Sequence, residues 1–222
     1  QNLGENQIME IIKSAKCAIF FIDEDQRVTL KDIGTKEEIV TWAKRLKAPV
    51  EEMTLKSQFR CNGSNGYLSW VDDVLGIRET ANETLDGISY DFRVCESPVE
   101  LRRLIIEANR GNNKSRMVAG YCWPWASKKD PRAFDIVMKE HGFAARWNLA
   151  DDGMLWIVST DSVNEVGCIH TCQGLDLDFV GVILGPDFLI RNGVIVTDAA
   201  KRAKADRSVF GYKSLLKANP EK

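Results

Sequence analysis

The sequence is defined first by what it lacks. No segment fits the phosphate-binding loop G-x-x-x-x-G-K-[S/T], so these 222 residues contain no Walker A loop of a P-loop NTPase. There is no apolar run long enough to span a bilayer and no signal peptide at the start. Two histidines and the lack of a C-x-x-C pair argue against a zinc site. We therefore expect a cytoplasmic protein without a membrane partner and without a metal bound by this chain.

An excess of charge of one sign is also missing, because the formal net charge is only -2. Any nucleic-acid binding must then use a local basic patch rather than the charge of the whole chain. A hydrophobic content of 44% and a charged content of 28% are typical of a soluble globular protein. The six cysteines are scattered through mostly apolar segments, which indicates free, buried thiols in a reducing compartment.

Apolar periodicity predicts helices and strands in alternation along the chain. The expected helices cover residues 7–15, 35–45, 67–75 and 97–109. The expected strands cover residues 16–22, 50–55, 88–94, 116–121, 155–159, 165–170 and 179–184, the last of them buried on both faces. Thr35 with Glu38 predicts a capping box, and Asn192-Gly193 predicts a β-hairpin over residues 189–196. This alternation indicates an α/β fold with a mostly parallel sheet and helices on both faces.

Four polar segments lie beside the ends of predicted strands. They are DEDQ at residues 23–26, QFRC at 58–61, GYCWPW at 120–125 and IHTCQGLDLD at 169–178. Ligands of open α/β sheets bind at the carboxyl ends of the strands, so we expect these segments to form a site there. Taken alone, Asp23 and Glu24 are compatible with a magnesium-binding strand end or with a solvated turn.

The same segments carry a resemblance to a known family. They lie in the stretches FFIDEDQRV, LKSQFRCNGS, RMVAGYCWPW and EVGCIHTCQGLDLDFVGVILG. In this order the stretches resemble the second half of a superfamily-1 helicase-type ATPase, and most of all the Schlafen-type helicase-like family of many bacterial proteins of unknown function. The resemblance covers about residues 17–187 and implies a RecA-like (P-loop NTPase-type) fold. Residues 1–34 would end the first ATPase lobe and form a linker, and residues 35–222 would be the second lobe, truncated before the family's final arginine motif.

The resemblance implies that a first group of residues contacts ATP. Gln26 would sense the γ-phosphate, Phe59 would stack on adenine, and Gln58 would touch the base or the ribose. Arg60 would reach the γ-phosphate from the second lobe, because a planar guanidinium grips phosphate oxygens through paired hydrogen bonds. Without the other motifs, Arg60 would be interpreted as a surface salt-bridge partner and Phe59 as a core residue. The ATP would carry Mg²⁺, with metal ligands outside this chain.

The IHTCQGLDLD segment resembles the helicase motif that couples nucleotide to nucleic acid. The resemblance implies that Gln173 and Gly174 open a helix whose amides face phosphate, and that Asp176 binds ribose. Asp176 is one methylene shorter than the family's usual glutamate. His170 and Thr171 would face the nucleic-acid strand. The alternative for His170 is an ordinary histidine at a strand end.

The chain is rich in basic residues between residues 102 and 129. These are Arg102, Arg103, Arg110, Lys114, Arg116, Lys128 and Lys129. Trp123 and Trp125 lie among them, and a basic groove with aromatic platforms is typical of single-strand binding. Lys128 and Lys129 are the strongest candidates because they lie in the loop after a strand. The alternatives are a charged solvent face for the arginines and core packing for the tryptophans.

Two hypotheses about function follow. In the first, the chain belongs to an ATP-driven motor on single-stranded DNA or RNA, its partner being the first ATPase lobe of the same parent protein. The chain alone would not hydrolyse ATP, because Walker A is absent. In the second, it is a nucleotide-regulated nucleic-acid-binding or scaffold module without unwinding activity, since a motif is not an activity. A nuclease would need an acidic cluster with a lysine at one strand end, and beyond DEDQ none is present.

Overall fold

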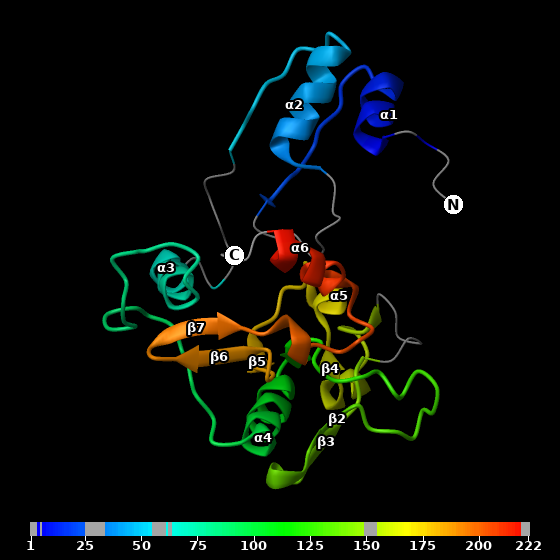
Figure 1. Ribbon diagram of the computed structural model, residues 1–222. Helices are drawn as coiled ribbons and strands as arrows, with labels where there is room; N and C mark the ends of the chain where they lie inside the picture. Colours follow the sequence, from blue (N-terminus) through cyan, green and yellow to red (C-terminus); the bar gives the residue numbers. More distant parts are fainter. Residues whose placement is uncertain are drawn as a thin grey trace. The chain divides into compact units, whose positions relative to one another are not determined.

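The structure is a computed structural model that describes residues 4, 6–24, 34–54, 61, 64–148 and 155–218. Contacts divide the chain into two units, Gln1–Gln58 with Arg207–Lys222, and Phe59–Asp206. Figure 1 labels the elements of each. The boundary that we expect at residue 34 separates two ATPase lobes. It is not the same division as these two units, and it stays a prediction.

The first unit contains two helices that pack on each other, α1 (Gln7–Ser14) and α2 (Lys36–Arg45) (Figure 1). The Thr35 hydroxyl caps α2 by accepting the Glu38 amide at 3.2 Å, as predicted. The Glu38 carboxylate reaches back to the amide of Gly34 at 3.0 Å instead of that of Thr35, and it also accepts the Asn6 side-chain amide at 3.1 Å. The capping acid therefore also ties the two helices together. The unit also contains the short helix α6 (Tyr212–Ala218).

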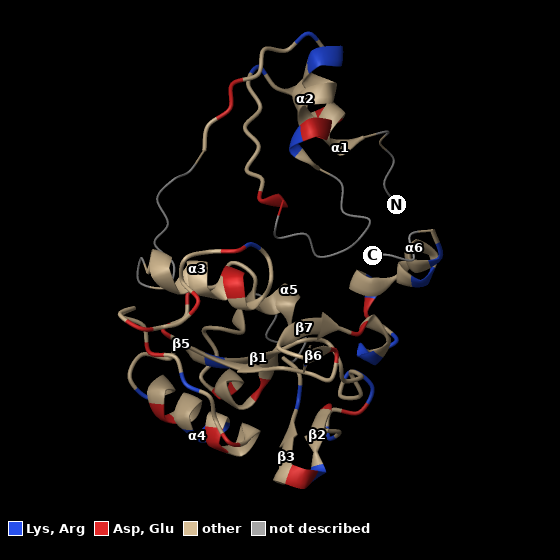
Figure 2. Ribbon diagram, turned by 60° about the vertical axis from the view of Figure 1, so that its left-hand side comes forward, with Lys and Arg blue, Asp and Glu red and all other residues tan. Residues whose placement is uncertain are grey.

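The second unit is organised around a parallel sheet of order β4–β1–β5. The strands are β1 (Ser115–Ala119), β4 (Val166–Gly167) and β5 (Phe179–Ile183). Helix α4 (Pro98–Asn109) packs against β1 and β5 (Figure 2). A Cβ on Gly181 would lie 2.8 Å from Ile105, so this glycine allows the helix to approach the strand closely.

Two hairpins and several short helices complete the second unit. The hairpins are β2 (Ile136–Met138) with β3 (Phe143–Ala145), and β6 (Phe188–Arg191) with β7 (Val194–Thr197). The helices are α3 (Asn65–Val74), α5 (Ile169–Cys172), and the 3-10 turns Lys139–His141, Asp161–Asn164 and Ala199–Lys201. Asn192 and Gly193 have φ of 53° and 78°, the left-handed values that a two-residue hairpin turn requires, so this prediction is confirmed.

The core of the second unit lies between α4, the sheet and the β2–β3 hairpin. Met117, Ile136, Trp147 and Val166 have no exposed surface there. No helix in the described part of the chain is long and apolar enough to cross a bilayer. The predicted α/β class with a parallel sheet is confirmed, and the structure differs in its details.

Several predicted strands are wrong. Residues 16–22, 50–54, 88–94 and 155–159 form no strand. Within the described residues these segments pair with no strand, and an apolar sequence alone does not supply a partner strand. In residues 88–94 the aromatic side chains find other contacts, because Tyr90 stacks on Tyr67 of α3 at 3.6 Å between ring centroids and Phe92 meets Trp70 edge-on at 4.9 Å. Of residues 165–170, only Val166–Gly167 is strand.

The expectation that residues 179–184 are buried on both faces is also wrong. Helix α4 covers the face of β5 that carries Gly181 and Ile183. On the opposite face Val180 and Val182 are 50% and 55% exposed, so no described helix of the second unit buries them. All six cysteines are free as predicted, but the expected burial is wrong for most of them: only Cys168 is buried, Cys17 is exposed, and the other four are partly buried.

Candidate nucleotide and nucleic-acid interface

The predicted site residues fall into described and undescribed parts of the chain. Gln26, Gln58, Phe59 and Arg60 lie outside the described residues. All the others belong to the second unit: Trp123, Trp125, Lys128, Lys129, His170, Thr171, Gln173, Gly174 and Asp176. Their arrangement around the sheet can therefore be compared directly.

The sheet separates these residues into two groups. Trp125 and Lys128 follow β1, and His170 and Thr171 follow β4, so they lie beyond carboxyl ends of parallel strands. Gly174 and Asp176 instead precede β5 and lie at the amino ends of the strands. The expectation that the polar segments form one site at the carboxyl ends is therefore wrong for these two residues. The reason is topological. A parallel connection must bring the chain from the carboxyl end of β4 back to the amino end of β5.

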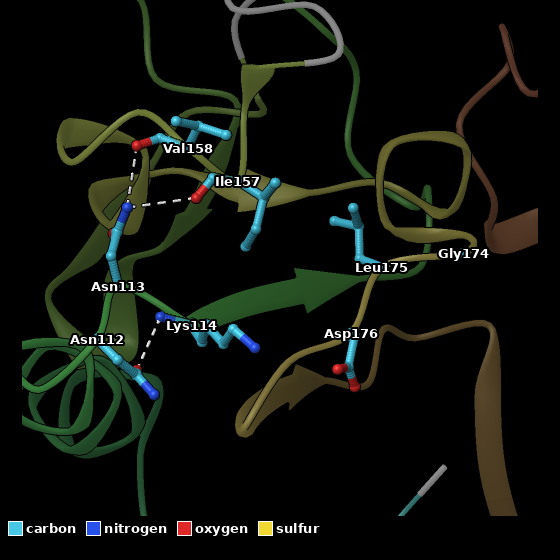
Figure 3. Close-up of a pocket in the computed structure, with 8 residues that line it drawn as sticks. All are labelled: Asn112, Asn113, Lys114, Ile157, Val158, Gly174, Leu175 and Asp176. Atoms are coloured by element: carbon cyan, nitrogen blue, oxygen red, sulfur yellow. Dashed lines mark hydrogen bonds between the residues drawn. The ribbon is translucent and has the colours of Figure 1, made fainter. Parts of the chain in front are cut away.

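An open pocket of about 480 Å³ lies at the amino ends of β1 and β5 (Figure 3). Its lining residues are Asn112, Asn113, Lys114, Ile157, Val158, Gly174, Leu175 and Asp176. In Figure 3 the side chains of Lys114 and Ile157 extend into the space that Leu175 and Asp176 border from the other side. The pocket thus combines one ammonium group, one carboxylate and apolar surface.

Side-chain hydrogen bonds hold the loops that form this pocket. The Asn113 side-chain amide donates to the carbonyl oxygens of Val158 at 3.0 Å and Ile157 at 3.3 Å. The Asn112 side chain accepts the Lys114 amide at 3.2 Å and also bonds to the carboxylate of Asp178. Because both asparagines connect segments far apart in the sequence, the pocket walls are fixed relative to each other.

Arg116 lies behind these loops and is completely buried. Its Nη2 donates to the Ile157 carbonyl at 2.9 Å and to the Asn113 side chain at 3.0 Å, and its Nη1 donates to Asn109 at 2.8 Å. Burial lowers the pKa of the guanidinium, and the charge of Glu165 opposes that change. The interpretation of Arg116 as part of a basic surface is therefore wrong, because the guanidinium satisfies backbone and amide oxygens of the protein.

The pair Gln173-Gly174 does not open a helix. Helix α5 ends at Cys172, and the Gln173 amide donates back to the Ile169 carbonyl at 2.9 Å. Gly174 has φ of 85°, a left-handed value that glycine adopts readily and that stops a helix. Both residues are exposed, and a Cβ on Gly174 would meet no atom within 4 Å, so the approach to this turn is open. A nucleotide contact by the pair remains a prediction.

The group at the carboxyl ends is aromatic. Trp147, which is fully buried, meets Tyr121 edge-on at 5.7 Å and Trp125 at 6.1 Å between ring centroids. Trp123 and Trp125 are half-buried and pack against the core, so core packing accounts for part of each ring. The ammonium of Lys128 lies 3.8 Å from the centroid of the Trp125 ring. Lys128 and Lys129 are both exposed.

His170 is exposed at the start of α5, and Thr171 is half-buried. The Thr171 hydroxyl lies 3.5 Å from the thiol of Cys168. The side-chain oxygen of Asn148 accepts the Cys168 amide at 3.1 Å and fixes the start of the helix. His170 is therefore presented to solvent by a short helix rather than held in the strand that was expected.

The carboxyl end of the sheet also contains a polar cluster that the sequence interpretation missed. The Cys122 thiol donates to Asp187 at 2.8 Å, and Arg202 pairs with the same carboxylate at 2.8 Å. Arg202 also pairs with Asp206. Burial and the neighbouring Asp187 raise the pKa of Cys122 to about 12. The cluster anchors the segment after β7 to the sheet.

Two further arginines of the predicted basic region have local roles. Arg102 donates to the Ala144 carbonyl at 2.8 Å and lies 4.3 Å from the centre of the Phe143 ring. Arg103 is exposed and pairs with Glu107 at 3.4 Å. Figure 2 shows Lys and Arg spread over several elements rather than gathered on one. The surface available to a nucleic acid is therefore narrower than the count of basic residues suggested.

Comparison with known proteins assigns the chain to a family. The family model described as "Schlafen group 3, DNA/RNA helicase domain" matches residues 1–222. The chain belongs to the Schlafen group 3 DNA/RNA helicase-domain family. This Schlafen group 3 domain is also similar to the uncharacterised protein YPL245W of Saccharomyces cerevisiae, with 24% identity over 204 residues, 82% of this chain and 44% of that protein. It thus spans less than half the length of this relative. No solved structure matches the chain.

Proposed function

We propose that this Schlafen group 3 domain is the second RecA-like lobe of a nucleic-acid-dependent ATPase that moves on or unwinds DNA or RNA. The domain supplies one half of the ATP site and a surface for a single strand. The first ATPase lobe of the parent protein supplies the phosphate loop and the ligands of Mg²⁺. The observation that carries the proposal is the position of Gly174 and Asp176, two motif residues that line the same pocket as Lys114.

The chemistry of the pocket suits part of a nucleotide. The Asp176 carboxylate can accept hydrogen bonds from ribose hydroxyls, and the Lys114 ammonium can neutralise a phosphate. Ile157 and Leu175 offer apolar surface, which ligand pockets use for the flat or ring-shaped part of a ligand. A volume of about 480 Å³ lies within the range of small-molecule sites. The Gln173 side chain, exposed next to Gly174, completes the predicted contacts.

The residues outside the described part of the chain have complementary roles in this proposal. Arg60 acts as an arginine finger that stabilises charge on the transferring γ-phosphoryl group. Gln26 orients water and the γ-phosphate, since a carboxamide donates and accepts at once. Phe59 and Gln58 hold the base. ATP hydrolysis then requires both lobes, and this domain alone is inactive.

The proposal is tested by steady-state ATP hydrolysis of the parent protein with and without single-stranded DNA and RNA. We expect stimulation by one nucleic acid and a loss of about 10³-fold in turnover for Arg60→Ala. Arg103→Ala is the matched control, because this exposed arginine pairs only with a neighbouring helix residue in the described structure. Turnover that ignores both nucleic acids, or that survives Arg60→Ala, would favour a binding or scaffold module instead.

A further inference from the structure

The loop after β1 is held in one conformation by a buried carboxylate. Asp135 accepts the Ser127 amide at 2.8 Å and the Ser127 hydroxyl at 2.6 Å. The same carboxylate accepts the backbone amide of Trp147 at 2.8 Å. Asp135 and Ser127 are both buried, so water does not compete with these bonds. The backbone immediately before Lys128 is therefore fixed to the core.

The Trp125 ring is fixed from the same side. It meets Trp147 at 6.1 Å and the edge of Tyr121 at 6.2 Å between ring centroids. The Trp147 indole nitrogen donates to the Trp123 carbonyl at 3.3 Å, which holds the backbone two residues before Trp125. Neither the loop nor the ring can move without breaking contacts with the core.

The Lys128 side chain is the movable part of this assembly. It is exposed, and its ammonium lies 3.8 Å from the centroid of the Trp125 ring. Among the described residues, no carboxylate lies within 4.0 Å of this ammonium. The ring is thus its main partner, and an exposed cation–ring contact shifts an equilibrium by about two- to fivefold. Such a contact is weak enough for a phosphate to replace it.

We propose that Lys128 is a latch on a base-stacking platform. In the free protein its ammonium covers the Trp125 ring. When a single strand binds, the ammonium moves from the ring to a backbone phosphate, and a base stacks on the ring face that has become free. This inference rests on the proposed nucleic-acid function. It adds that Lys128 and Trp125 contact each other in the free protein, so they do not act as independent contacts of the strand.

The latch predicts the sign of the coupling between Lys128 and Trp125 in oligonucleotide binding. In the unaltered protein Lys128→Ala removes a phosphate contact but also removes the obstacle to stacking. In a Trp125→Leu background there is no ring to cover, so the same change removes only the phosphate contact. Lys128→Ala should therefore weaken binding less in the unaltered protein than in Trp125→Leu, by about two- to fivefold. A double-mutant cycle isolates this difference.

The cycle is measured with the 222-residue chain and fluorescein-labelled oligothymidylate and oligouridylate, by fluorescence anisotropy at several salt concentrations. Lys129→Ala is the matched control, because this neighbouring lysine is exposed and lies over no ring in the described structure. Its effect should be the same in both backgrounds. Where Trp125→Leu does not fold, Trp125→Phe replaces it, and the coupling keeps its sign with a smaller size.

Each outcome decides between named alternatives. Equal effects of Lys128→Ala in the two backgrounds would overturn the latch and leave two independent contacts. A larger effect in the unaltered protein would also overturn it, because lysine and ring would then bind the strand together. Absence of oligonucleotide binding by the unaltered chain would overturn the nucleic-acid part of the proposed function and the latch with it.

Discussion

The two ends of the parallel sheet are built from different interactions. At the amino ends of β1 and β5, a buried arginine and two asparagines join the loops around an open pocket through hydrogen bonds to carbonyl and amide oxygens. At the carboxyl end of β1, packed aromatic rings and the buried carboxylate of Asp135 fix a loop that presents two lysines to solvent. The amino end thus forms a concave site with one positive and one negative side chain. The carboxyl end presents a tryptophan ring and two lysines.

In the proposed function, the two ends of the sheet bind two different ligands. A pocket with an ammonium, a carboxylate and apolar walls matches a small ligand with a sugar and a phosphate. Exposed lysines beside a half-buried tryptophan match an extended strand, because backbone phosphates and bases repeat along it. The short helix α5 connects the two ends, since it begins after β4 and is followed by the turn at Gly174.

The largest expected effect comes from a substitution in the buried hydrogen-bond network at the amino end of the sheet. Arg116→Met should lower the free energy of unfolding by about 3–5 kcal/mol, because it leaves buried oxygens without their donor. Urea unfolding followed by circular dichroism measures this loss. Arg103→Met, on the exposed face of α4, should change the same quantity by at most about 0.5 kcal/mol. Similar small losses for both variants would mean that the amino end does not depend on the buried network.

A second prediction concerns a thiol at the carboxyl end. Burial and Asp187 raise the pKa of Cys122 to about 12, so at pH 8 almost all of this thiol is protonated. Since the thiolate is the reactive form, alkylation of Cys122 at pH 8 should be much slower than alkylation of an exposed thiol. Exposed Cys17 is the internal control. Mass spectrometry after iodoacetamide treatment measures both, and equally fast labelling would contradict the closed cluster around Asp187.

The smallest expected effects come from substituting one lysine at each end of the sheet. Lys129→Ala should reduce the salt dependence of oligonucleotide binding by about 0.7 in logarithmic slope, the value for one phosphate of a single strand. Lys114→Ala should leave that slope unchanged and weaken ADP binding about fivefold, as loss of one exposed charge contact does. Anisotropy and calorimetric titrations measure the two quantities. A slope change for Lys114→Ala would place the strand at the amino end.

The sequence alone was sufficient to predict features that depend on a few neighbouring residues. The cap of α2 by Thr35, which accepts the Glu38 amide at 3.2 Å, and the turn at Asn192-Gly193 each depend on a few neighbouring residues. Strand predictions failed where pairing was required, as in residues 88–94, whose aromatic side chains pack on α3 instead of a strand partner. Periodicity detects an apolar face but does not identify what covers it.

The candidate site was predicted only in part for the same reason. Gly174 and Asp176 could be selected by motif, whereas Lys114 has no motif and enters the site only because β1 and β5 are neighbours. Arg116 was counted as a surface base because its sequence neighbours are basic. Its partners, the carbonyl oxygens of Ile157 and Ser159, come from a distant loop that only the folded chain brings near.

The most direct test of two ligands at two ends is a pair of titrations followed by ¹H–¹⁵N correlation spectra of the chain. ADP should shift the amide signals of Lys114, Gly174 and Asp176 and leave Lys128 unchanged. A single-stranded oligonucleotide should shift Lys128, His170 and Thr171 and leave Lys114 unchanged. Shifts by both ligands at the same end of the sheet, or by neither at the end assigned to it, would contradict the account.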